Sequence, residues 1–410
     1  MTTIQHSKHQ ALAKTFILLF TVALMFGQSA VAQVKVAVQE KRTWEFKDAG
    51  IRFNNDFPGA RLNECSQVGS NQFRILILPE NAPVNNSPWF AFQVVAKRPT
   101  TVTVTLAYEK GKHRYHPKIS HDGKTWTMLG ANAYHRDREK NEAALTFKVG
   151  PKPVWIAAQE MIGGKELTAW MNGLSKRKFV EKSLVGKSMQ GRAIEQLEIG
   201  SGSSSNYVFI IGRQHPPEVT GSFGLMSFTE TIAGNSSVAQ NFRKHFSTIV
   251  IPLLNPDGVE HGHWRHNMGG VDLNRDWNKF DQPETTLVRD HLVKIGSPTG
   301  ARVFLMLDFH STGNDIFYTQ TDAQKTFPED FTKNWLAAIQ GRFPDYKVVR
   351  SGSHDPRGNT SKVWGFMQFG AACITYELGD NTDRKRIRQI TSGAAEEMMK
   401  MFLAEIGERN

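Results

Sequence analysis

The chain has 410 residues, 40% of them hydrophobic and 22% charged, which excludes a disordered chain and predicts a globular protein of two domains. The 50 lysine and arginine residues outnumber the 39 aspartate and glutamate residues and give a formal net charge of +11. A basic surface favours acidic partners, but because no nucleic-acid recognition motif is present, we expect no binding to nucleic acid.

The first 32 residues have the pattern of a secretory signal peptide. Lys8 and Lys14 precede an apolar stretch, residues 15–27, and a small-residue cleavage site ends at Ala32. The apolar stretch is shorter than the roughly 20 residues of a membrane-spanning helix. We therefore expect cleavage after Ala32, no transmembrane segment in the mature chain and a secreted or periplasmic protein. Loss of the two lysines lowers the formal charge from +11 to +9.

Residues 33–150 consist of short apolar runs separated by turns. The runs include Phe73–Leu78, Trp89–Val95 and Thr101–Leu106, and none has helical periodicity. Strands at this spacing predict an all-β sandwich domain. We expect none of its residues to be catalytic, and we expect its histidines to lie on turns at the surface.

From about residue 181 to residue 410, strands alternate with helices, and residues 151–180 connect this part to the sandwich. Alternation of this kind predicts an α/β domain whose sheet is covered on both faces, with a functional site at the strand ends. The expected strands are Ala193–Ile199, Tyr207–Gly212, Thr248–Leu254, Val303–Phe309 and Ala371–Tyr376. The expected helices are Glu218–Ile232, Pro328–Phe343 and Ile387–Ile406.

Three residues have the pattern of a catalytic zinc site. His215 and Glu218 stand three positions apart after a predicted strand, and His310 ends a later apolar run. Two imidazoles and one carboxylate leave a fourth coordination position open, as catalytic zinc sites require. A His-x-x-Glu pair by itself is about as often a loop histidine beside a capping glutamate, and a lone His310 would usually be a core residue.

Further segments occur in a characteristic order and make the pattern specific. They are Asn255-Pro256-Asp257-Gly258, Trp264-Arg265, Asp272-Leu273-Asn274-Arg275, Leu307-Asp308-Phe309-His310 and Tyr376-Glu377. With them, residues 170–405 resemble the zinc metallocarboxypeptidases of the carboxypeptidase A type. The preceding β segment resembles, more loosely, the N-terminal β-domain of cytosolic carboxypeptidases and their bacterial relatives. The resemblance implies a mixed, mostly parallel sheet with helices on both faces, one Zn²⁺ per chain and a peptide substrate with a free C-terminus.

The resemblance also implies the roles of the metal ligands and their neighbours. His215, Glu218 and His310 would bind zinc, and Asp272 would orient His215. Glu377 would act as the general base, which takes a proton from water and passes it to the leaving amine. Structural alternatives are a turn-forming Asp272 and a strand-end Glu377 that forms a salt bridge.

Four further residues are implied to contact the substrate. Asn274 and Arg275 would bind its terminal carboxylate, because a planar guanidinium contacts both oxygens at once. Arg265 would stabilise the oxyanion formed from the scissile carbonyl. Lys362 aligns with an arginine that, in cytosolic carboxypeptidases, lies at the floor of the specificity pocket and pairs with acidic C-terminal side chains. A preference for acidic C-terminal residues follows, with a surface lysine as the alternative.

The chain departs from the family pattern at two places. Pro217 stands where relatives have glycine, which stiffens the turn without removing a ligand. Relatives also carry a substrate-binding tyrosine on a mobile loop, whereas residues 350–355 contain none. Arg350 and His354 are the candidates to replace it.

Two other functions compete with peptide hydrolysis. The first is an N-acyl amino-acid deacylase of the aspartoacylase and succinylglutamate-desuccinylase type, which shares the His-x-x-Glu…His ligands. The Asn-Pro-Asp-Gly segment and the Trp264-Arg265 pair favour the carboxypeptidase. The second is a catalytically silent binding protein, which the presence of all three ligands and the base argues against.

Overall fold

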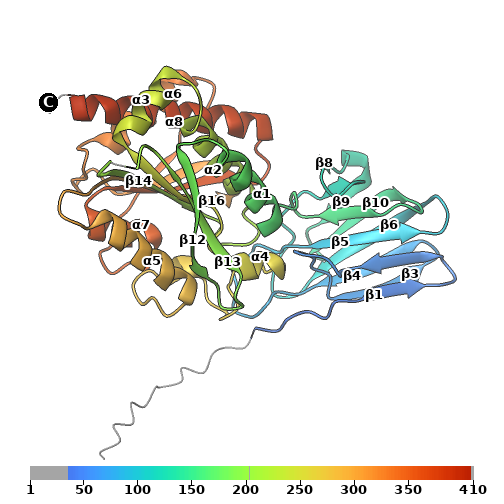
Figure 1. Ribbon diagram of the computed structural model, residues 1–410. Coiled ribbons are helices and arrows are strands. Elements are labelled where there is room, and N and C mark those ends of the chain that lie inside the picture. Colours follow the sequence, from blue (N-terminus) through green and yellow to red (C-terminus); the bar gives the residue numbers. More distant parts are fainter. Residues whose placement is uncertain (1–35, 203, 408–410) are drawn as a thin grey trace, which may run out of the picture. The chain divides into compact units, whose positions relative to one another are not determined.

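The computed structural model describes residues 36–202 and 204–407 (Figure 1). The predicted signal peptide, residues 1–32, lies outside these ranges, so its cleavage and the export of the chain stay predictions. Within the two ranges, no helix combines the length and the hydrophobicity that a membrane span requires.

The N-terminal part is a sandwich of two β-sheets around an aromatic core. Phe53, Phe73 and Phe92 fill this core and have no exposed surface. One sheet has the order β1 (Thr43–Phe46), β2 (Ile51–Asn54), β5 (Ala91–Ala96), β11 (Val154–Ala157), β7 (Lys118–Ser120) and β8 (Thr127–Met128). The other has the order β3 (Glu64–Gly69), β4 (Gln72–Ile77), β6 (Thr100–Tyr108), β10 (Glu142–Val149) and β9 (Tyr134–Asp137). The prediction of an all-β fold for this part is confirmed.

The sandwich extends into the segment predicted to connect the domains. Strand β11 lies in that segment and pairs antiparallel with β5 on one side and β7 on the other. Helix α1 (Gly164–Leu174) follows it. The connecting stretch between sandwich and α1 is therefore short.

The surface position expected for the histidines is wrong for His113. Its side chain is buried, with Nδ1 2.7 Å from the Tyr108 hydroxyl and Nε2 2.9 Å from the Tyr134 hydroxyl. Burial lowers the pKa of His113 to about 4, helped by the charge of Arg136. The two tyrosines reach it from different strands, a contact that the local turn pattern does not reveal.

The second part is built on an eight-stranded mixed sheet. Its order is β12 (Val180–Lys187), β13 (Ala193–Ile199), β15 (Ser247–Ile251), β14 (Asn206–Gly212), β16 (Arg302–Thr312), β19 (Ala372–Gly379), β17 (Ile316–Thr319) and β18 (Arg350–Gly352). The four central strands, β15, β14, β16 and β19, run parallel to one another. Their carboxyl ends therefore meet at one edge of the sheet, where functional sites of α/β folds lie.

Helices cover both faces of this sheet, as predicted. On one face lie α2 (Val219–Ile232), α3 (Ser237–His245), α6 (Phe331–Arg342) and α8 (Arg384–Gly407), and on the other α5 (Pro283–Gly296) and α7 (Ser361–Phe369) (Figure 1). The short α4 (Pro256–Glu260) packs with α1. Along β14, Val208 and Ile210 pack into the core on the side of α2 and α8, whereas Phe209 and Ile211 pack into the core on the side of α5 and α7. Because both faces are buried, the strand is apolar throughout.

The sandwich and the α/β part belong to one compact unit. Val219, at the start of α2, and Trp264 are buried in the hydrophobic core of the sandwich. Arg114 of the sandwich donates to both carboxylate oxygens of Asp380, over 2.7 and 3.2 Å, just after β19. The β-sandwich thus packs directly against the edge of the sheet where the central strands end.

Candidate metal centre and active site

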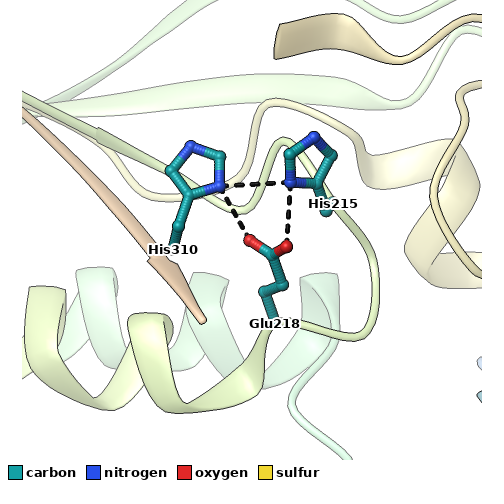
Figure 2. A group of neighbouring side chains, drawn as sticks. All are labelled: His215, Glu218 and His310. Atoms are coloured by element: carbon teal, nitrogen blue, oxygen red, sulfur yellow. Dashed lines mark hydrogen bonds and ion pairs between the residues drawn. The ribbon is translucent and has the colours of Figure 1, made fainter. Parts of the chain in front are cut away.

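The three predicted metal ligands meet at the carboxyl edge of the sheet. His215 lies in the turn after β14, Glu218 immediately precedes α2, and His310 lies near the end of β16. Figure 2 shows the two imidazoles facing the Glu218 carboxylate. Nδ1 of His215 lies 2.9 Å from Oε1 of Glu218, and Nδ1 of His310 lies 2.7 Å from Oε2. All three side chains are buried, and one ligand atom from each lies within 4.8 Å of the others.

The hydrogen bonds of the two histidines leave the right atoms for a metal ion. Nε2 of His215 lies 2.8 Å from an Asp272 oxygen, and Nε2 of His310 lies 2.9 Å from an Asp308 oxygen. A carboxylate accepts the hydrogen bond at each Nε2 atom, which leaves Nδ1 as the atom of each ring that a metal ion would bind. These two Nδ1 atoms, 3.1 Å apart, face the Glu218 carboxylate. A buried set of two nitrogens and one carboxylate fits zinc.

The charges of the cluster also favour a cation. Burial lowers the pKa of His310, but the charges of Asp308 and Glu218 outweigh it and raise this pKa well above its ordinary value. Burial raises the pKa of Glu218, whereas His215 and His310 hold it well below its usual range. Positive charge is thus strongly stabilised between these groups, and a divalent cation would replace the proton there.

Asp272 connects His215 to Arg265. One Asp272 oxygen faces His215, and Nε of Arg265 donates to the other over 2.8 Å. The Arg265 guanidinium also lies 3.4 Å from Oε1 of Glu218. Burial raises the pKa of Asp272, but His215 and Arg265 hold it well below its ordinary value. Asp272 therefore stays ionised and places the guanidinium beside the metal ligands.

Asp308 contacts one of the predicted metal ligands, and the sequence analysis predicted no role for it. Its Oδ2 faces Nε2 of His310 and accepts hydrogen bonds from Gln214 Nε2, over 2.6 Å, and from the Ser361 hydroxyl. The signal was present in the sequence. Asp308 and His310 are two positions apart on one strand, so their side chains lie on the same face.

We expect Asp308→Asn to weaken zinc binding by about 10- to 100-fold, because the neutral amide no longer fixes the His310 ring or raises its basicity. Competition with a chromogenic chelator measures the change. The control is Asp276→Asn, which alters an equally buried aspartate bonded to Asp281, Gln282 and Thr285 and not to a ligand. Wild-type zinc affinity in Asp308→Asn would refute the orienting role.

Glu377 lies beside the cluster with a free carboxylate oxygen. Strands β16 and β19 pair His310 with Glu377, so the two side chains are neighbours on one face. Its Oε2 is buried and, among the described residues, has no hydrogen-bond partner. Burial and then the charge of Glu218 raise the pKa of Glu377 to about 7, while His310, His215 and Arg265 act against this. A carboxylate with this pKa and an unused acceptor has the properties of a general base.

Arg275 and Asn274 differ in their freedom to bind a substrate. Arg275 is exposed, donates to the Asn274 carbonyl over 2.7 Å and has no carboxylate partner among the described residues. The amide oxygen of buried Asn274 instead accepts from the Ser361 backbone over 2.9 Å. Arg275 is therefore available to an anionic ligand, whereas Asn274 holds the first turn of α7 against the site. Their roles in substrate binding stay predictions.

Lys362 lies in the first turn of α7 and is buried, which excludes an ordinary surface lysine. Its Nζ donates to the carbonyls of Thr319 and Ser353 over 2.9 and 2.6 Å. Burial lowers the pKa of Lys362 to about 8, and no carboxylate among the described residues pairs with it. The Lys362 ammonium group is thus bound only by neutral acceptors among the described residues. Lys362 directly follows Ser361, whose hydroxyl donates to Asp308.

The two candidates for the missing tyrosine also differ. The Arg350 guanidinium is engaged by Thr319, Gln320 and Asp322. His354 packs edge-on against Phe366, and its buried Nδ1 has no hydrogen-bond partner among the described residues. His354 is therefore the candidate that remains available.

Comparison with known proteins matches the sequence of this chain to one family. The profile described as zinc carboxypeptidase matches residues 167–397. A Zymomonas mobilis protein of unassigned function is 28% identical over 261 residues, covering 60% of this chain and 65% of its own. Cytosolic carboxypeptidase 6 of Caenorhabditis elegans is 23% identical over 284 residues, covering 63% of this chain and 62% of its own. The chain thus spans less than two thirds of the length of these curated relatives.

Solved structures show the same fold. A metallo-carboxypeptidase from Burkholderia cenocepacia superposes with a TM-score of 0.72 at 18% identity, covering 88% of this chain and 100% of its own. One from Pseudomonas aeruginosa gives a TM-score of 0.69 at 18% identity, covering 85% of this chain and 98% of its own. The likeness therefore covers the sandwich as well as the α/β part. Since the family profile spans more than half of the chain, and a buried His-Glu-His cluster that could hold a metal ion lies at the sheet edge, the chain belongs to the zinc carboxypeptidase family.

Proposed function

We propose that this protein is a zinc-dependent carboxypeptidase that binds one zinc ion per chain and hydrolyses the C-terminal peptide bond of peptides. The observation that carries the proposal is the buried His215, Glu218 and His310 cluster with the unpaired oxygen of Glu377 beside it. When bound, a zinc ion supplies Lewis-acid chemistry, which polarises a carbonyl group and lowers the pKa of water.

The residues around the cluster supply the other parts of a hydrolytic site. Glu377 accepts a proton from the attacking water and delivers it to the leaving amine. Arg265, held by Asp272, donates hydrogen bonds to the oxyanion that forms on the scissile carbonyl. Exposed Arg275 binds the terminal carboxylate and selects peptides with a free C-terminus.

The assay uses one peptide with a free C-terminus, the same peptide amidated, and an N-acetylated amino acid. We expect release of the last residue from the free peptide only, loss of activity with a chelator and recovery with zinc. Cleavage of the acylated amino acid alone would identify a deacylase. Zinc binding without any hydrolysis would identify a binding protein.

We propose in addition that the enzyme prefers acidic C-terminal residues, through Lys362. A buried ammonium without a carboxylate partner is destabilising, and its lowered pKa reports this. A glutamate or aspartate side chain of the substrate would provide the missing negative charge. The basic composition of the chain, with a formal charge of +11, favours approach of the same substrates.

We expect kcat/KM for a peptide ending in glutamate to exceed that for matched peptides ending in phenylalanine or lysine. Lys362→Met should lower it by about 10- to 100-fold, since a hydrogen bond to a charged group contributes roughly 1.5–3 kcal/mol. Lys362→Glu should reverse the preference towards lysine. Because Lys362 is charged only below its pKa of about 8, the acidic preference should weaken as the pH rises through 8. A wild-type preference for phenylalanine or lysine would contradict the proposal.

A further inference from the structure

A carboxylate of the β-sandwich binds the loop that carries Arg265. Glu80 follows strand β4 and accepts hydrogen bonds from three consecutive backbone N–H groups. The donors are Trp264, over 2.7 Å to one oxygen, and Arg265 and His266, over 2.9 and 2.7 Å to the other. Glu80 is only 2% exposed, so these bonds form away from water.

Two neighbouring contacts fix the same loop to the sandwich. The amide oxygen of Asn81 lies 2.6 Å from Nδ1 of His266, and its amide nitrogen donates to the Gly270 carbonyl over 3.0 Å. The fully buried Trp264 ring packs so closely on Gly111 that a Cβ there would overlap it. The loop is therefore held on the sandwich at both its beginning and its end.

The electrostatic setting of Glu80 shows that it is ionised. Burial by itself raises the pKa of its carboxyl, but His263, Arg61 and the backbone N–H groups of His266 and Trp264 hold this pKa below its ordinary value. A buried charge is costly unless its hydrogen bonds are satisfied. Bonds from N–H groups to an ionised carboxylate are shorter and stronger than neutral ones. Glu80 therefore restrains three successive peptide units more firmly than a neutral acceptor would.

The restrained loop leads directly to the metal ligands. From the backbone that Glu80 holds, the Arg265 side chain reaches Asp272 over 2.8 Å and approaches Glu218 to 3.4 Å. Asp272 in turn faces His215. We propose that Glu80 is a positioning residue of the active site, through which the β-sandwich sets the place of the Arg265 guanidinium. This inference rests on the proposed function, in which Arg265 stabilises the oxyanion.

The position of an oxyanion donor matters because it acts only in the transition state, so its displacement lowers kcat more than it changes KM. A shift of about 1 Å costs up to about 100-fold in rate. Glu80→Gln keeps the size of the side chain but removes the charge and at least one acceptor of the three N–H groups. We expect it to lower kcat by about 10- to 100-fold, with KM and zinc content close to wild type.

A double-mutant cycle separates positioning from general stability. If Glu80 acts through Arg265, the Glu80→Gln/Arg265→Ala protein should be no slower than Arg265→Ala alone. The control is Glu160→Gln, which removes the negative charge from the ion pair of Glu160 with Arg384 and leaves the loop untouched. It should keep wild-type kcat. Losses that multiply in the double mutant, or a kcat within twofold of wild type in Glu80→Gln, would overturn the inference.

Hydrogen exchange gives a readout that needs no catalysis. The amides of Trp264, Arg265 and His266 should exchange faster in Glu80→Gln than in wild type and Glu160→Gln. Unchanged exchange in Glu80→Gln would overturn the inference. Faster exchange in Glu80→Gln, together with a wild-type protein that has no peptidase activity, would refute the proposed function alone. Should Glu80→Gln fail to fold, Asn81→Ala takes its place in the same cycle. It removes the neighbouring contact with His266, and multiplicative losses would again count against the inference.

Discussion

Glu377→Gln is expected to lower kcat by about 10²- to 10⁴-fold, the contribution of a general base, while the zinc content stays at the wild-type level. Glutamine has nearly the same shape but cannot accept the proton, and Glu377 is not a member of the His-Glu-His cluster. Steady-state kinetics and metal analysis of the same preparation measure the two properties. An active Glu377→Gln protein would contradict the assignment.

A matched control distinguishes this effect from the removal of any half-buried carboxylate. Glu198, on β13, also has a raised pKa, caused by burial and the charge of Glu181. It belongs to a strand distant in sheet order from β19. Glu198→Gln should therefore retain wild-type kcat and zinc content.

The fall of kcat/KM at low pH should reflect protonation of the Glu377 carboxylate. A base works in its ionised form, so activity should fall as the pH falls through the pKa of Glu377, which is about 7 with the site free of metal. A divalent cation among the ligands adds positive charge and lowers this pKa. This fall in the zinc enzyme is therefore expected below pH 7, and it should be absent from the residual activity of Glu377→Gln.

His215→Ala and His310→Ala are each expected to lose both zinc and activity, down to background. Either change removes one of three buried ligand side chains and leaves Glu218 with a single imidazole neighbour. Metal analysis after dialysis should give about one zinc per wild-type chain and almost none in either variant. His291→Ala, which removes a half-buried histidine bonded to Gln196, should keep zinc. Stoichiometric zinc in His215→Ala or His310→Ala would exclude the proposed ligand set.

The cluster of His215, Glu218 and His310 could be predicted because the place of each residue depends on local sequence. The apolar run of β14 ends at Gly212, and the chain then turns through His215 to Glu218 at the start of α2. His310 ends another apolar run, on a strand that pairs in parallel with β14. A continuous run of apolar residues predicts a buried parallel strand, and the carboxyl ends of parallel strands meet at one edge of the sheet. The order of the motifs supplied the remaining information.

Elements without such continuous patterns were not predicted. Helices α3, α5 and α7 had no counterpart among the predicted elements. Helix α5 is largely polar and buries only a few apolar side chains, among them Val288 and Leu292. Packing against the sheet, rather than periodicity, stabilises such a helix. The consequence for the site is direct, because α7 buries Lys362, for which a surface loop was the alternative.

Sequence by itself thus determined the layered α/β architecture and predicted the His215, Glu218 and His310 cluster with Glu377 beside it, since these follow from hydrophobic runs, short spacings and the order of the motifs along the chain. Only the tertiary structure showed which other groups contact and orient these residues and the loop of Arg265. Glu80 binds backbone at Trp264, 184 positions later, and Asp308 meets Gln214 and Ser361 from other elements. Contacts of this kind form when distant segments pack and satisfy buried charges, and a buried carboxylate that binds backbone N–H groups leaves no periodic or spacing signal in the chain.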